Sequence, residues 1–232
     1  MSLDFNADSS FGGNQQYQRQ SNFQGNNGFS KNNGRFSGPN RNFFKKKEED
    51  TGPTRLYKTY AGTGNPDAPQ EVLDQMTRLA KELEVHGFIV RTGGLKGPEE
   101  VFEKAVSQNN LELHLPWRGF DNKNSKFTFT AKPIHEIAKM FHPTYDQLKP
   151  VIHAFLAKNV RIVLGKDAKS PAMFVLCWSS DGAETSVEKT ARTGNVGHAI
   201  SVAASLRIPV FNLQKPDAES RLKKYLGLLS NG

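Results

Sequence analysis

"FIVRTGGLKGPEEVFEKAV", residues 88–106, contains in succession an apolar strand pattern, a glycine-rich loop and a helical pattern. Pro98 suits the first turn of that helix, where the backbone N–H that proline lacks would have no partner. The segment is flanked by "RLYKTYAG" (55–62), a predicted strand, by an amphipathic helical pattern over 68–87, and by "LELHLPW" (111–117), another predicted strand. This β-α-β-α-β order predicts a parallel sheet with right-handed crossovers.

The alternation continues to the end of the chain. Helices are predicted over 133–141, 145–159, 196–207 and 217–229, and strands over 160–165, 172–180 and 208–213. No internal repeat is visible. The pattern predicts an α/β fold with a mostly parallel sheet and helices on both faces.

The first part of the chain has a different composition. Residues 1–50 contain no Val or Ile and one Leu, and their aromatic residues recur every six or seven positions among Asn, Gln, Gly and Ser. Such a segment buries too little apolar surface to offset its ordering entropy, so we expect residues 1–53 to form a disordered arm and residues 54–232 the folded domain. Aromatic and basic side chains together suit stacking on unpaired bases or weak self-association; a solubilising leader is the alternative.

Charge and composition limit the function classes. The net charge is +8, which suits a polyanionic partner, although an inert basic surface is equally compatible. Cys177 is the single cysteine, which excludes an internal disulfide and a cysteine-based zinc site. His135, His142 and His153 lack metal-ligand spacing, so neither a metal nor another cofactor is expected. With no apolar stretch of about 20 residues and no signal peptide, we expect a cytoplasmic protein without membrane contact.

Three glycine-containing turns stand where strands lead into helices, at residues 61–69, 92–100 and 192–199. Helix-start N–H groups and closely approaching glycine backbone favour anions, and the three turns should share the carboxyl edge of the sheet. Neither GxGxxG nor a P-loop is present, and plain turn chemistry is the alternative for any one of them. The predicted phosphate contacts are Gly62, Thr63, Gly64, Thr92, Gly93, Gly94, Lys96, Gly97, Thr193, Gly194, Asn195 and Gly197.

Catalytic candidates are fewer. Cleavage of a glycosidic bond needs a carboxylate near the sugar and a base to hold the phosphate, and Glu99 or Glu103 with Arg91 offers that combination. Acidic residues in a first helical turn also stabilise the helix dipole, which is the simpler interpretation. Trp117, at the end of a predicted strand, suits either stacking on a base or packing.

The motifs "YAGTGNPDAP", "VRTGGLKGPEEVFEKAV", "LHLPWRGF", "FHPTYDQL", "FVLCWSSDG" and "TGNVGHAISVAASLRIPVFNL" occur in this order from residue 57 to 213. As an ordered set they resemble a phage-encoded group of DprA-like proteins, within the superfamily that joins DprA with the LOG phosphoribohydrolases. The resemblance implies a Rossmann-like nucleotide-binding fold, with phosphate held at the double-glycine loop and at Gly194 and Gly197. Where the group has Gly-Ala-Asp, this chain has Gly97-Pro98-Glu99.

The resemblance implies two kinds of activity. DprA members bind single-stranded DNA and load a recombinase, whereas LOG members cleave nucleoside monophosphates with a PGGxGTxxE motif that this chain lacks. The preferred hypothesis is a protein of phage DNA processing, or of nucleotide-signal binding, in the host cytoplasm. The alternatives are a nucleoside-monophosphate N-glycosidase and an assembly protein that acts through its arm. A homo-oligomer is compatible with each.

Overall fold

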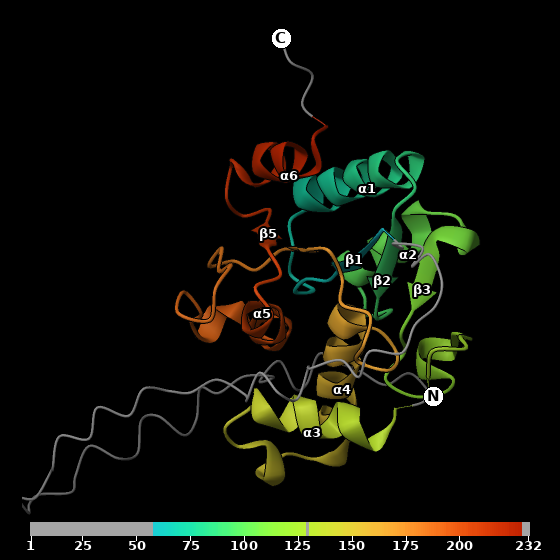
Figure 1. Ribbon diagram of the computed structural model, residues 1–232, viewed down its shortest axis with the longest axis vertical. Helices are drawn as coiled ribbons and strands as arrows, with labels where there is room; N and C mark the ends of the chain where they lie inside the picture. The colour runs from blue at the N-terminus through green and yellow to red at the C-terminus, as the bar shows by residue number, and fades with distance from the viewer. Residues whose placement is uncertain (1–57, 129, 229–232) are drawn as a thin grey trace, which may run out of the picture.

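The computed structural model describes residues 58–128 and 130–228 (Figure 1). The predicted arm, residues 1–53, and its boundary with the domain lie outside the described residues. Five parallel strands form one sheet in the order β3-β2-β1-β4-β5, which confirms the predicted Rossmann-like α/β class. The order reverses between β1 and β4, the position at which open α/β sheets bind ligands. The strands are β1 (Thr59–Gly62), β2 (Ile89–Thr92), β3 (Leu111–Leu113), β4 (Val175–Cys177) and β5 (Val210–Asn212).

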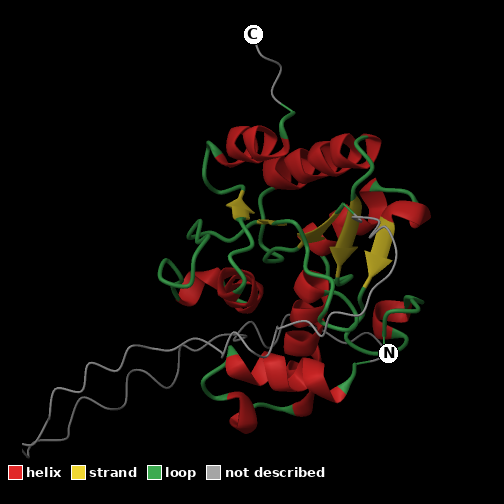
Figure 2. Cartoon of the chain, viewed as in Figure 1, coloured by secondary structure: helices red, strands yellow, loops and turns green. Residues whose placement is uncertain are grey.

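Helices cover both faces of the sheet (Figure 2). One face carries α1 (Gln70–Val85), α2 (Pro98–Ala105) and α6 (Ala218–Leu226), and the other carries α3 (Lys132–Met140), α4 (Pro150–Leu164) and α5 (Val196–Ser205). Short 3-10 helices are η3 (Gln108–Asn110), η4 (Phe120–Asn122), η5 (Tyr145–Gln147) and η6 (Ala191–Thr193). Among the described helices, none is both long enough and apolar enough to cross a membrane.

The two cores differ in character. Tyr60 of β1 stacks on Phe174 at 5.2 Å between ring centroids, and Phe88 and Phe102 contact its edge, so aromatic rings fill the core beneath α1, α2 and α6. Aliphatic residues of α3, α4 and α5 fill the opposite core. Two packed layers on one sheet leave its carboxyl edge to the loops.

The strand predicted over 160–165 is wrong, because these residues continue α4 to Leu164. Every residue from Leu156 to Leu164 is buried, and a helix buried on all sides lacks the amphipathic period that distinguishes it from a strand. The helix predicted over 145–159 accordingly begins later, at Pro150, after the separate 3-10 turn η5. The long α4 places a lysine beneath the glycine turns.

Candidate functional site at the carboxyl edge of the sheet

The three glycine turns meet at one edge of the sheet, as expected. The Asn65 side-chain amide, in the first turn, donates hydrogen bonds to the backbone carbonyls of Arg192 and Thr193 in the third, at 3.3 and 3.2 Å. The Thr63 hydroxyl donates to the Glu99 carboxylate of the second turn at 2.8 Å. The first turn thus bridges the other two beside the β1–β4 switch point.

Small residues are required where the turns touch. A Cβ on Gly62 would lie 2.6 Å from the Phe102 ring, and one on Gly64 would lie 2.5 Å from Pro98. At Gly194, φ is +58° and a Cβ would lie 2.9 Å from the Asn65 amide oxygen, so both backbone conformation and space favour glycine. The other predicted glycines lie in the same turns: Gly93, Gly94 and Gly97 in the second, and Gly197 in the first turn of α5.

A buried ion pair occupies the double-glycine loop. The Lys158 ammonium of α4 lies 2.5 Å from the Glu99 carboxylate, and the two side chains are 1% and 0% exposed. The other carboxylate oxygen accepts the Leu95 backbone N–H at 3.1 Å. A Cβ on Gly93 would lie 2.2 Å from the Lys158 Cδ, which explains the glycine. The loop therefore holds an anion, and that anion is the chain's own carboxylate.

The Gly97-Pro98-Glu99 sequence lies at the centre of this arrangement. Pro98 contacts Gly64, and the Glu99 carboxylate takes the donors that a ligand phosphate would use at the double-glycine loop. The Thr92 hydroxyl also faces inward, donating to the Glu99 backbone carbonyl at 3.2 Å. The Thr63 hydroxyl, the Leu95 N–H and the Lys158 ammonium are thus used within the fold, and the predicted phosphate contacts at this edge stay predictions.

The three catalytic candidates have separate partners. The Arg91 side chain is 5% exposed, and its Nε donates to Glu112 at 2.7 Å while its guanidinium also donates to the Ser170 carbonyl. Glu103 pairs with the Lys123 ammonium at 2.7 Å. Arg91, Glu103 and the buried Glu99 are thus each engaged within the fold and do not converge on one point.

A charge cluster lies where β2 and β3 end. Burial opposes ionisation of Glu112, but the hydrogen bond from His114 and the charge of Arg91 outweigh it and lower the pKa of Glu112 to about 2. Burial lowers the pKa of His114 to about 4, although the bond to Glu112 works against this shift. His114 also stacks on Phe127 at 4.8 Å between ring centroids. The cluster carries a neutral imidazole and an ionised carboxylate at neutral pH.

A second internal carboxylate holds the third turn. Asp181 accepts hydrogen bonds from the Thr190 hydroxyl and backbone N–H, from the Thr193 hydroxyl, from the Ser179 hydroxyl and from the Ala183 backbone N–H. Burial alone would raise the pKa of Asp181, but these bonds outweigh it and hold the pKa far below its usual range. The Thr193 side chain, predicted to contact phosphate, is therefore used within the turn.

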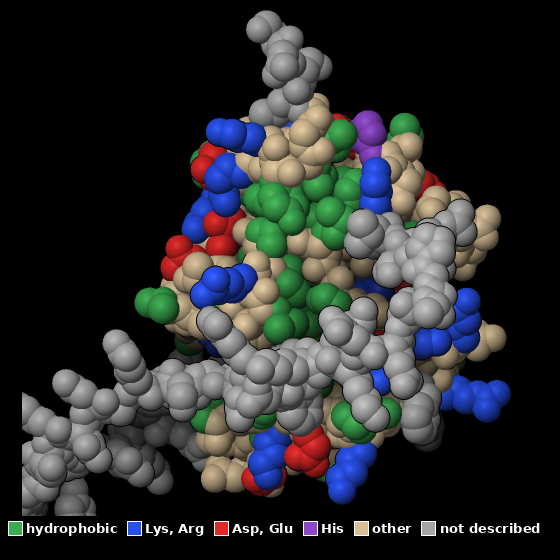
Figure 3. Space-filling view, in the orientation of Figure 1, with side chains coloured by type: hydrophobic (Ala, Val, Ile, Leu, Met, Phe, Trp, Pro, Cys, Tyr) green, Lys and Arg blue, Asp and Glu red, His purple; other side chains and the backbone are tan. Residues whose placement is uncertain are grey.

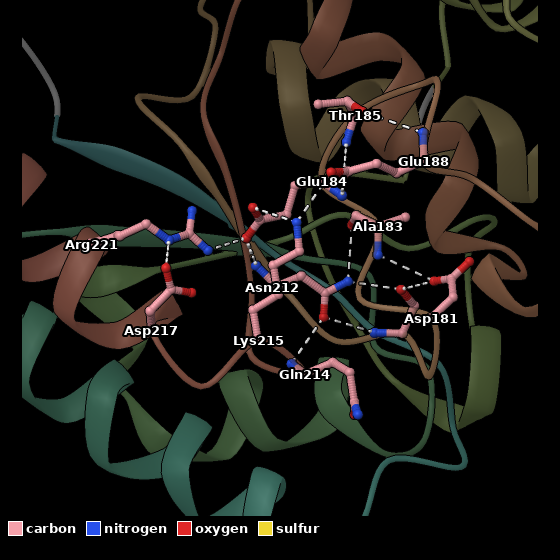
Figure 4. Close-up of polar contacts among 11 residues, drawn as sticks. Asp181, Ala183, Glu184, Thr185, Glu188, Asn212, Gln214, Lys215, Asp217 and Arg221 are labelled. Atoms are coloured by element: carbon pink, nitrogen blue, oxygen red, sulfur yellow. Dashed lines mark hydrogen bonds and ion pairs between the residues drawn. The ribbon is translucent and has the colours of Figure 1, made fainter.

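Polar contacts shown in Figure 4 anchor the same loop to the end of the sheet. Glu184 accepts the Asn212 backbone N–H at 2.9 Å and the Arg221 guanidinium at 2.7 Å, and it pairs with Lys215 at 3.2 Å. The Asn212 amide, which is fully buried, donates to the Ala183 backbone carbonyl. β5, α6 and the segment between them thus hold the loop that leads from β4 to the third turn.

Some groups at this edge remain open. The side chains of Lys96 and Arg192 are exposed, and neither forms an ion pair with another described residue. Gly194 is also exposed, two residues before α5 begins at Val196. The buried amide oxygen of Asn195 has no hydrogen-bond partner among the described residues. The edge therefore offers two cations and a helix N-terminus to an anionic ligand.

Sequence reasoning missed the residues that organise this site. Lys158 stands in the run "FLAKNVRIVL", where a single lysine inside an apolar segment is the available signal of a buried partner. Asn65 lies in the first turn but is not one of the predicted phosphate contacts, and Asp181 lies between the strand predicted over 172–180 and the helix predicted over 196–207. No group of three His, Cys, Asp or Glu side chains in the described part of the chain is placed to hold a metal.

Comparison with known proteins gives one weak likeness. No family model matches the chain, and no curated protein does. The chain is similar to DNA processing protein A from Helicobacter pylori, in a structure described for its single-stranded DNA binding mode. The two share 16% identity over 77% of this chain and 78% of that one, with a TM-score of 0.43. This likeness is too slight to assign a family or a function.

Proposed function

We propose that the chain binds a nucleotide or a single strand of nucleic acid at the carboxyl edge of its sheet. The observation that carries this proposal is the meeting of three glycine turns at the switch point, through the bonds of Asn65 to Arg192 and Thr193. Ligands of open α/β sheets bind at that position. The net charge of +8 favours a polyanionic ligand.

The ligand phosphate would lie over the exposed Gly194, near the Arg192 side chain of the same turn. The first turn of α5 adds its dipole and N–H groups. An unpartnered buried acceptor costs about 1–3 kcal/mol, and a ligand hydroxyl or amino group that reaches the Asn195 amide oxygen would remove that cost. In the double-glycine loop the Leu95 N–H already binds Glu99, so that donor is not offered to the ligand.

Binding is better supported than cleavage. Glu99 is fully buried against Lys158, and Glu103 is paired with Lys123, so neither carboxylate is open to a sugar. The enzymatic alternative requires free base to be released from nucleoside monophosphates, and requires Glu103→Gln to abolish that release. We expect no release from any common nucleotide. A role in phage DNA processing, or in sequestering a nucleotide signal, fits a binding protein of this kind.

A pair of glycine variants tests the site. Gly194 and Gly87 both have positive φ, +58° and +78°, but a Cβ on Gly194 would meet Asn65, whereas Gly87 has open space and lies in the turn between α1 and β2. We expect Gly194→Ala to weaken binding of dTMP and of oligo(dT) by at least about tenfold, and Gly87→Ala to leave both unchanged, because an interaction loss of ~1.4 kcal/mol is tenfold. Equal affinities in the two variants would exclude the site.

The arm requires its own test, because residues 1–57 lie outside the described part. If the arm adds nucleic-acid contacts, deletion of residues 1–50 lowers affinity for oligo(dT) but leaves dTMP binding unchanged. If all oligo(dT) binding disappears with the arm while Gly194→Ala has no effect, the protein acts through its arm and the binding function proposed for the folded domain fails.

A further inference from the structure

The loop that follows β3, residues 115–127, presents an aromatic ring at the same edge of the sheet. We call it the tryptophan loop. Trp117 is 38% exposed, and its ring rests edge-on against Phe120 and Phe155, with centroids 5.0 and 5.5 Å away. The two phenylalanines thus support the indole from one side, and part of the ring remains accessible.

The tryptophan loop is held firmly at both ends. The buried Arg161 of α4 donates to the carbonyls of Leu115 and Phe127, each at 2.6 Å. Lys123 donates to the Gly94 carbonyl at 2.8 Å and so ties the loop to the double-glycine turn. A ring on so constrained a loop loses little conformational entropy when a ligand stacks on it.

Basic side chains lie in the tryptophan loop and next to it. Arg118 and Lys126 are exposed within the loop, with the Lys126 ammonium 5.2 Å from the Phe127 ring centroid. Lys96 is exposed and follows Leu95, which packs against the same apolar cluster as Phe120. The loop also contains an acidic residue, Asp121, whose carboxylate forms an ion pair with the Lys123 ammonium at 3.8 Å. Figure 3 shows several Lys and Arg side chains on the right-hand side, where the segment after β3 lies in Figure 1, and others on the left and lower sides.

We infer that Trp117 is a stacking platform for an unpaired nucleic-acid base, with Arg118, Lys126 and Lys96 contacting the flanking phosphates. The inference rests on the function proposed above and extends it: a single strand would run along the carboxyl edge from the third glycine turn to the tryptophan loop. Aromatic rings among cations are the combination that proteins use to bind single strands. A duplex keeps its bases stacked and paired and cannot use an exposed ring in this way.

The geometry sets the ligand length. The third turn follows β4 and the tryptophan loop follows β3, and three strand intervals separate these two strands. At about 4.8 Å per interval the span is about 14 Å. Stacked nucleotides rise about 3.4 Å each, so roughly four are needed to reach from one end to the other. A mononucleotide held at the third turn would not contact Trp117.

Tryptophan fluorescence tests the platform directly in the full-length chain. The chain has two tryptophans, and Trp178 is 3% exposed with its indole N–H bonded to Gln214. Because the Trp178 carbonyl also accepts the Asn65 N–H of the first glycine turn, the part of a fluorescence change that is lost in Trp117→Phe is the part that reports Trp117. We expect an oligo(dT) or oligo(rU) of about twelve nucleotides to quench the signal. The oligonucleotide that binds with higher affinity identifies DNA or RNA as the nucleic acid whose base stacks on Trp117.

Variants then separate stacking from packing. Trp117→Leu keeps an apolar side chain over the two phenylalanines but removes stacking, and we expect oligonucleotide affinity to fall by about 5- to 150-fold, the range for one base–aromatic stack. Trp117→Phe should retain most of the affinity and lose the fluorescence response. Tyr225→Ala removes an exposed aromatic residue on α6, 49% exposed, and should leave oligonucleotide affinity unchanged.

Binding of dTMP distinguishes the two proposals. If Trp117→Leu binds oligonucleotides as tightly as the unaltered chain while dTMP still depends on Gly194, the platform is excluded and the glycine-turn site stands. If the unaltered chain binds neither dTMP nor any oligonucleotide, both proposals fail. The platform is supported if Trp117→Leu loses oligonucleotide affinity but keeps its dTMP affinity, and if Trp117→Phe keeps most of its oligonucleotide affinity.

Discussion

Replacing Lys158 by methionine removes the cation that neutralises the Glu99 carboxylate beneath the glycine turns. The two charged atoms lie 2.5 Å apart, and both side chains are at most 1% exposed, so the carboxylate cannot turn to water. Removing one partner of a buried pair costs about 3–5 kcal/mol of unfolding free energy. Glu99 keeps its hydrogen bonds from Thr63 and Leu95 in this variant. We therefore expect Lys158→Met to lower the free energy of unfolding by about 3 kcal/mol, the lower end of that range.

The reverse change and the double variant complete a thermodynamic cycle. Glu99→Gln leaves a buried ammonium without its counter-charge and should also cost about 3–5 kcal/mol, whereas the double variant has no unpaired charge and should cost no more than about 2 kcal/mol. Urea unfolding of the four proteins measures these differences. Additive losses, with the double variant as unstable as the two single variants summed, would refute a tightly coupled pair.

Three further predictions concern the same region. Gly93→Ala would place a methyl group in the buried ion pair, so it should destabilise the fold by about 1–3 kcal/mol and lower nucleotide affinity, measured by urea unfolding and titration. Burial lowers the pKa of His114 and of His198 to about 4. Because these folded-state pKa values lie below the ordinary 6.5, the contribution of each histidine to the free energy of unfolding is complete above pH ~6.5. It is lost as the pH falls toward 4, by up to about 3 kcal/mol for each histidine. Equal urea midpoints at pH 7 and pH 4.5 would contradict this prediction. Asp181→Asn removes the charge that gathers five donors around the third turn, so limited proteolysis should cut residues 180–193 faster, and an unchanged cutting rate would contradict the anchoring role.

Local signals in the sequence predicted the order of elements and the meeting of the turns. Strand patterns that end in glycine, and the proline that begins α2, depend on neighbours a few residues away. Because the strands are parallel, the turns after β1 and β2 must lie at the same edge of the sheet. The hydrogen bond from the Asn65 amide to the Thr193 carbonyl shows that the third turn lies at that edge too. What each turn binds was beyond such signals.

The errors have long-range causes. The second half of α4 is apolar and β-branched, and because the fold buries all its sides, residues 160–165 matched a strand pattern. Lys158 pairs with a glutamate 59 residues earlier, and no local pattern identifies a partner at that separation. For the same reason Glu99 was a candidate for catalysis, although the structure places its carboxylate inside the loop that was expected to hold a ligand phosphate.

The salt dependence of oligo(dT) binding to the full-length chain tests the central claim most directly. Four exposed cations, Lys96, Arg118, Lys126 and Arg192, line the proposed path. Each phosphate contact to a single strand contributes about −0.7 to the slope of log affinity against log salt concentration, so we predict a slope of about −3 or steeper. A slope near zero, or no measurable binding at low salt, would contradict the proposal that this edge binds single-stranded nucleic acid.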